Sequence, residues 1–130
     1  EMRTKIANFI NNNKITNYIK EVSVNDETNV TTLTIQTIGY VKSAPIITTV
    51  EIDSEGRIIS FTSNTSRETY NDEHNSRWDI PNGHPNEVIP PRIIDEQKAD
   101  VDGVAGATVT SNAIKAAAAI AFEYAKEVIK

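Results

Sequence analysis

Residues 46–63 read IITTVEIDSEGRIISFTS, and this stretch decides the fold. Two runs rich in isoleucine, threonine and valine, 46–52 and 58–63, are typical of strands. The four residues between them end in Gly56, and glycine can supply the positive φ of a bulged turn. The stretch therefore predicts a β-hairpin with its turn at 53–56.

The residues before this hairpin predict a helix and a second hairpin. Apolar side chains recur at helical spacing across 1–10, and the asparagine run at 11–13 ends the pattern. Apolar and polar residues alternate across 15–24, and a turn signal follows at 25–26. The Thr-, Ile- and Val-rich segment 30–40 is expected to form the returning strand.

The region after residue 63 is less regular. Periodicity is lost between Ser66 and Pro91, a segment that holds four prolines and both histidines. A long irregular stretch in a compact domain is usually functional or mobile, so this is where a ligand could be covered. Residues 93–100 are expected to form a short strand or a connector.

The strongest single pattern predicts a C-terminal helix that runs to Lys130. Thr110, Ser111 or Asn112 can cap its N-terminus. Its apolar positions form one broad face, made of Ile114, Ala117, Ala118, Ala121, Phe122, Ala125, Val128 and Ile129. Strands followed by a long closing helix predict an α+β fold, with a twisted, mainly antiparallel sheet packed by helices.

Length and composition exclude several classes of protein. At 130 residues, the whole chain 1–130 is expected to form one domain. Thirteen Lys and Arg against eighteen Asp and Glu give a net charge of -5, which disfavours binding to nucleic acid or to an anionic membrane surface. The absence of cysteine excludes disulfides, thiolate metal sites and cysteine nucleophiles. The longest apolar stretch, 116–122, is far shorter than the roughly 20 residues of a membrane span, so no transmembrane segment is expected.

Residues 102–112 read DGVAGATVTSN and lead directly into the predicted C-terminal helix. A loop of small residues that opens a helix presents backbone N–H groups to an anion, and the helix dipole favours negative charge there. Gly106 allows close approach to a phosphate, and Ala107 adds little bulk. Hydroxyls that can donate hydrogen bonds or form a covalent bond follow at Thr108, Thr110 and Ser111. The same residues also fit the ordinary cap of a helix, so the local pattern leaves both interpretations open.

The segment 102–108 resembles the flavinylation motif of the FMN-binding domain family. That family occurs in the flavin subunits of sodium-translocating NADH:quinone oxidoreductases and Rnf complexes and in extracytoplasmic flavoproteins. Its motif runs Asp-x-x-Ser/Thr-Gly-Ala-Thr, and the last threonine is esterified to the phosphate of FMN. Matching position by position implies that Thr108 is the acceptor. The chain departs from the motif at Ala105, where the family usually has Ser or Thr.

The resemblance extends over roughly residues 36–125, and 1–35 hold the predicted N-terminal helix and hairpin. The segment from Gly39 and Tyr40 through Pro45 and Ile46 and the hairpin 50–58 are similar in order and spacing to segments of the family.

A Glu-Thr pair lies beside the isoalloxazine ring in the family, and the resemblance implies this role for Glu68 and Thr69. The family usually has Pro-Gly after the pair, whereas this chain continues differently, with Tyr70 and Asn71. Tyr70 or Trp78 could stack on the ring instead, or could anchor the loop.

The resemblance implies a small electron-transfer module that carries FMN and is not a stand-alone catalyst, with redox chemistry that belongs to the flavin. Thr108 would hold the phosphate through a phosphoester. Backbone N–H groups from Gly106 to Thr110, those of Ala107 and Val109 included, would offset its negative charge together with Ser111 and the helix dipole.

The resemblance also implies a location and partners. The family's extracytoplasmic members suggest a bacterial protein outside the cytoplasm, anchored to the membrane through a segment that is not in this sequence. A flavin transferase that uses FAD as donor would attach the FMN, and membrane or extracytoplasmic redox partners would exchange electrons with it. We expect the flavin to be absent when the domain is produced in a host without the transferase.

Other functions remain as alternatives. The pocket could hold FMN or another phosphorylated ligand reversibly, with Ala105 marking the loss of the modification signal. A purely structural or adhesive domain would have no phosphate pocket at the Gly106 loop. His74 and His84 lack the spacing of metal ligands and are expected to be surface residues. No Ser-His-Asp arrangement supports a hydrolase.

Overall fold

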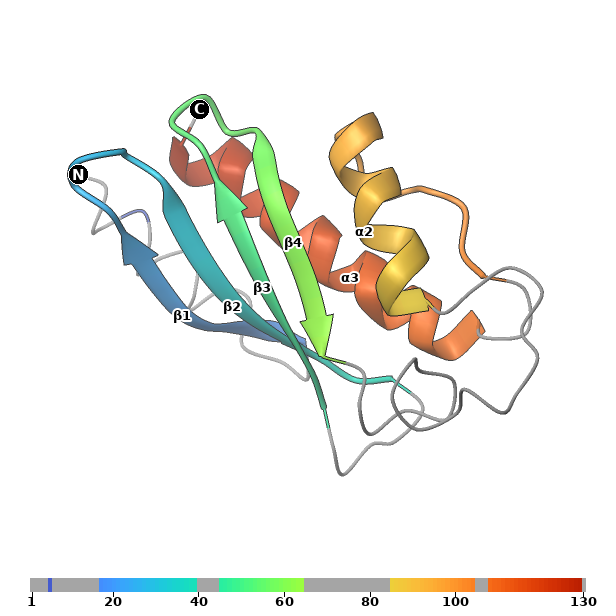
Figure 1. Ribbon diagram of the computed structural model, residues 1–130. Coiled ribbons are helices and arrows are strands. Elements are labelled where there is room, and N and C mark those ends of the chain that lie inside the picture. Colours follow the sequence, from blue (N-terminus) through green and yellow to red (C-terminus); the bar gives the residue numbers. More distant parts are fainter. Residues whose placement is uncertain (1–4, 6–16, 40–44, 65–84, 105–107, 130) are drawn as a thin grey trace.

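The computed structural model describes residues 5, 17–39, 45–64, 85–104 and 108–129, and the structural statements below refer to these residues. A four-stranded antiparallel sheet forms one layer, and helices α2 and α3 cover one of its faces (Figure 1). The predicted α+β class is therefore confirmed. The predicted helix at 1–10 lies outside the described residues, apart from Lys5.

The sheet is a simple meander in the order β1-β2-β3-β4. Its strands are β1 (Tyr18–Val24), β2 (Thr31–Thr37), β3 (Ile46–Ile52) and β4 (Ile58–Asn64), so both predicted hairpins are confirmed. Gly56 has a φ of 86° in the β3–β4 turn, and its N–H donates to the carbonyl of Asp53 at 3.0 Å. The register shifts beside this turn, between Glu51 and Ile52, as a bulged turn requires.

The core lies between the sheet and the two helices. Alternate residues of β2 and β3 face inward, and cross-strand neighbours such as Leu33 and Val50 are fully buried. Ile114 of α3 packs into the same cluster. Because the inner face is apolar along most of its length, it fixes which face of the sheet the helices cover.

Helix α2 (Pro85–Glu96) corrects two predictions, the irregular stretch through Pro91 and the strand or connector at 93–100. Pro90 and Pro91 lie inside it, where each removes a backbone hydrogen bond. Ile89 and Ile93, one turn apart, are fully buried against the core, and each such side chain gains roughly 1.5–3 kcal/mol. Tertiary burial therefore outweighs the local preference against helix.

Gln97 attaches the end of α2 to the sheet. Its Nε2 donates to the carbonyls of Ile58 and Ile94, both at 2.8 Å, and its Oε1 accepts from the N–H of Ile58 at 3.0 Å. The side-chain amide thus pairs with β4 as a neighbouring strand would. Its φ of 51° turns the chain out of the helix at this point.

Helix α3 (Thr108–Tyr124) continues into a single π-helical turn, η1 (Ala125–Ile129). The C-terminal helix is confirmed, and all residues of the predicted apolar face are buried or partly buried in the core cluster. The expected cap at Thr110, Ser111 or Asn112 was wrong, because the helix begins at Thr108. The hydroxyl of Ser111 instead accepts a hydrogen bond from the preceding loop, so it belongs to the first turn and not to the cap.

The N-terminus of α3 lies at the end of the sheet where β4 ends and β3 begins (Figure 1). None of the helices in the described part of the chain is long and apolar enough to span a bilayer.

Tyr124 gives the fold a predicted sensitivity to alkaline pH. Its side chain is fully buried, and burial raises its pKa from 10.0 to about 12 because the phenolate would lose its hydration. Between pH 10 and 12 the unfolded chain releases this proton while the native chain keeps it, so the free energy of unfolding falls as pH rises. The loss is expected to be on the order of 2 kcal/mol by pH 11.5.

Urea unfolding at a series of pH values from 8 to 11.5 measures this loss in the wild type and in Tyr124→Phe. The other tyrosines are common to both proteins and cancel in the comparison. The Phe variant is expected to show the flatter profile, and parallel profiles would contradict the assignment.

Candidate functional site

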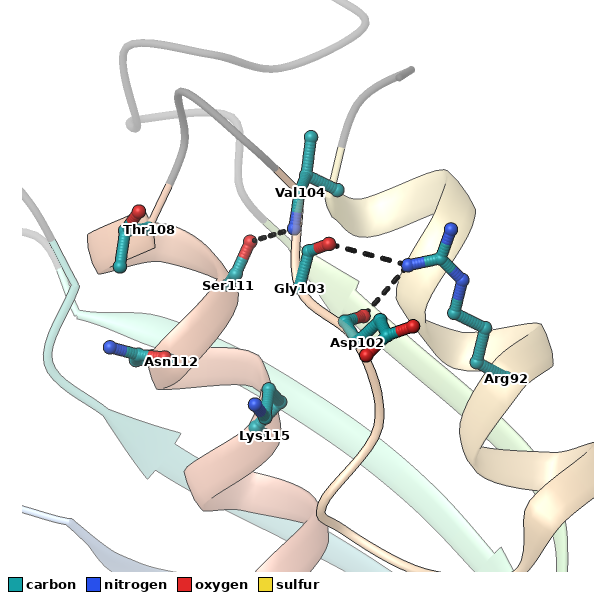
Figure 2. A pocket seen from close by; sticks show the side chains of 8 residues that line it. All are labelled: Arg92, Asp102, Gly103, Val104, Thr108, Ser111, Asn112 and Lys115. Carbon is teal, nitrogen blue, oxygen red and sulfur yellow. Dashed lines mark hydrogen bonds between the residues drawn. The ribbon is translucent and has the colours of Figure 1, made fainter.

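An open cleft of about 600 Å³ lies at the N-terminus of α3 (Figure 2). One wall is the first two turns of α3, and the other is formed by the loop 102–104 and by α2. Its lining is mostly polar and consists of Arg92, Asp102, Gly103, Val104, Thr108, Ser111, Asn112 and Lys115.

The wall from α3 follows the helical repeat. Thr108, Ser111 and Lys115 lie three and four residues apart, which places them on one face of the helix in successive turns. Thr108 is exposed in the first turn, so its hydroxyl is accessible from the cleft. The first four backbone N–H groups of a helix have no hydrogen-bond partner within the helix. They lie at its N-terminus, where the helix dipole is positive.

Hydrogen bonds from α2 and from α3 hold the loop 102–104 in the opposite wall. Arg92 Nη1 donates to the carbonyl of Asp102 at 2.7 Å and to that of Gly103 at 3.4 Å. The N–H of Val104 donates to Ser111 Oγ at 3.0 Å. The carbonyl and the N–H of a trans peptide point in opposite directions, so the Gly103–Val104 peptide unit is fixed by α2 at one end and by α3 at the other (Figure 2).

Gly103 lies where the loop closely approaches α3. A Cβ atom at this position would lie 3.1 Å from Ser111 Cβ. Gly103→Ala is therefore expected to push the loop away from α3 and to weaken the buried hydrogen bond between Val104 and Ser111. We expect a loss of about 1–2 kcal/mol in the free energy of unfolding, measured by urea denaturation.

Asp102→Ala is the matched control, because this neighbour is exposed and its side chain makes neither of the two hydrogen bonds. Equal stabilities of Gly103→Ala and Asp102→Ala would show that the contact with Ser111 is not tight.

The cleft carries more positive than negative charge, in a chain whose net charge is -5. Arg92 and Lys115 both line it, from α2 and α3, with the loop 102–104 between them (Figure 2). The carboxylate of Asp102 is exposed. Lys115 Nζ is 4.0 Å from Asp100 Oδ1, at the limit of an ion pair, and Asp100 is fully solvated. Together with the positive end of the helix dipole, these charges favour an anionic ligand.

The residues predicted for the site are placed as follows. Thr108 lines the cleft, and Val109 beside it is half exposed without lining it. Thr110 and Ser111 are buried, with 3% and 1% of their surface exposed, and of these two only Ser111 lines the cleft. Four further predicted residues lie outside the described part of the chain, namely Gly106, Ala107, Glu68 and Thr69. Their roles stay predictions.

Sequence reasoning missed Arg92, Gly103 and Lys115. Lys115 follows Thr108 by seven residues, or two helical turns, so the helical repeat contained a signal for it. Arg92 could not be found in this way, because its helix was not predicted.

A metal site finds no support among the described residues, which contain no group of three or more His, Asp or Glu side chains in suitable positions. His74 and His84, expected at the surface, lie in the segment that is not described.

The fold and the cleft define a small α+β domain with a mostly polar cleft, lined by two cations, at the first turn of its last helix. A family model described as FMN-binding domain matches residues 39–123, well over half of the chain. The chain therefore belongs to the FMN-binding domain family, as the resemblance of its motif implied, and it is a flavin-binding protein. Neither the search of curated proteins nor that of solved structures found a match.

Proposed function

We propose that this domain carries FMN on Thr108 through a phosphoester and acts as an electron-transfer module. The observation that carries the proposal is the position of Thr108. Its hydroxyl is exposed at the first turn of α3 and lines a cleft, in a chain that belongs to the FMN-binding domain family. A threonine in the core could not have been modified.

The residues present fit the group. A volume of about 600 Å³ is within the usual range for a small-molecule site. The first turn of α3 offers N–H donors to a phosphate, and Lys115 adds a positive charge in the same cleft. These features are what a phosphoryl group requires and what a purely structural or adhesive domain would not need.

Attachment would proceed by substitution at phosphorus. The Thr108 hydroxyl loses its proton and forms an O–P bond to the FMN half of FAD, the diphosphate bond of FAD breaks, and AMP leaves. A flavin transferase would bind FAD and catalyse this step. Once bound, the flavin supplies one- and two-electron redox chemistry, and the protein fixes its orientation and exposure.

A covalent link is useful where a lost cofactor cannot be replaced. This consideration supports a location outside the cytoplasm, with attachment to the membrane through another segment and with redox partners there. The absence of cysteine is compatible with that location.

Intact-mass spectrometry under denaturing conditions tests the proposal. When the domain is produced together with a flavin transferase, its mass is expected to increase by one FMN moiety, and the yellow colour is expected to stay with the unfolded chain. Without the transferase the domain is expected to be unmodified. Flavin that is released on denaturation would support reversible binding instead, and would contradict the covalent link.

A further inference from the structure

We infer that Lys115 is the side chain that attracts the phosphoryl group of the flavin nucleotide into the cleft. The inference rests on the proposed function and adds a residue from outside the motif. It concerns the reversible binding of the nucleotide, before or without a covalent bond to Thr108.

The position of Lys115 on α3 supports this role. It follows Thr108 by seven residues, so the two lie on nearly the same face of the helix, about 10 Å apart along its axis. Side chains on a helix lean toward its N-terminus, which is the direction of Thr108 from Lys115. Both side chains line the same cleft (Figure 2).

Lys115 and Arg92 differ in the contacts that their side chains already make within the protein. The Nη1 of Arg92 is used to hold the carbonyls of Asp102 and Gly103, so Arg92 positions the loop. Within the described part of the chain, the ionic neighbour of Lys115 is Asp100, whose fully exposed carboxylate lies 4.0 Å away, a longer contact than those of Arg92. About three quarters of the Lys115 side chain is nevertheless covered. Arg92 keeps further N–H donors, but its guanidinium is held at the loop, so Lys115 is the cation on the wall that also carries Thr108.

The surroundings of Lys115 make its charge effective at a distance. The dipole of α3 adds partial positive charge at the same end of the cleft. The carboxylates near it, Asp100 and Asp102, are both exposed and therefore well screened by water. A dianionic phosphoryl group is attracted across several ångströms here, whereas the neutral part of the flavin is not.

A comparison of two ligands and four proteins tests this inference. Unmodified ¹⁵N-labelled domain, produced without transferase, is titrated with FMN and with riboflavin in 0.1 M salt, and amide shifts of residues 108–115 report binding. Lys115→Gln is expected to weaken FMN binding about fivefold and to leave riboflavin binding unchanged. Lys115→Arg is expected to restore FMN binding to within twofold.

Lys126→Gln is the matched control. It removes the same charge from the exposed face of η1, eleven residues farther along, which is well beyond the Debye length in 0.1 M salt. It is expected to change the binding of neither ligand.

Three results would overturn the inference: equal loss of FMN and riboflavin affinity in Lys115→Gln, an effect of Lys126→Gln as large as that of Lys115→Gln, or no FMN-induced shifts at 108–115 in the wild type. Mass spectrometry of the co-produced proteins separates this failure from a failure of the proposed function. If the wild type still gains FMN, the proposed function stands and the role of Lys115 does not.

Discussion

Thr108→Ala is expected to abolish the covalent attachment of FMN completely. The variant lacks the only exposed hydroxyl in the described first turn of α3, since Thr110 and Ser111 are at least 97% buried. The oxygen of Ser111 also accepts the N–H of Val104, so presenting it to a transferase would require the loop to leave α3. No neighbouring hydroxyl is therefore expected to substitute for Thr108.

Denaturing intact-mass spectrometry after co-production with a flavin transferase measures the result. Thr108→Ser keeps a hydroxyl at the same place and is expected to be modified. Val109→Ala changes an exposed neighbour outside the cleft and is expected to be modified like the wild type. An FMN adduct on Thr108→Ala would show that the acceptor lies elsewhere in the chain.

The parts of the fold that depend on local pattern could be predicted from the sequence. The β3–β4 hairpin needs a positive φ at one turn position, and Gly56 supplies it where the pattern required it. The broad apolar face of α3 follows directly from its spacing. The predicted face did not include Tyr124, whose whole side chain is buried.

Helix α2 could not be predicted because its cause is not local. Pro90 and Pro91 oppose a helix in any isolated segment, and only the burial of Ile89 and Ile93 against a sheet formed elsewhere in the chain stabilises it. For the same reason, the wall of the cleft that α2 forms could not be predicted. Arg92 lies on α2, and its hydrogen bonds to the loop exist only once that helix is in place.

The sequence motif, by contrast, was sufficient to predict Thr108 as a residue of the site. Thr108 is identified by its neighbours in sequence, and a helix start after a small-residue loop gives it an accessible hydroxyl. The loop's support by Arg92 and Ser111 depends on contacts between segments that are seven to eleven residues apart. Sequence pattern therefore locates the proposed acceptor, and the tertiary contacts determine the shape of the cleft around it.

Ala118→Leu is expected to destabilise the domain by about 3 kcal/mol, because α3 has no room for a larger side chain on its inner face. Ala117, Ala118 and Ala121 are fully buried where α3 packs on the sheet. Adding three carbon atoms there forces either strained rotamers or a shift of the helix that carries Thr108. Ala119→Leu is the matched control, since this neighbour is exposed and leucine is nearly as good a helix former as alanine. Urea unfolding of the two variants and the wild type measures the difference in the free energy of unfolding. Equal stability of the two variants would mean that the inner face of α3 is loosely packed.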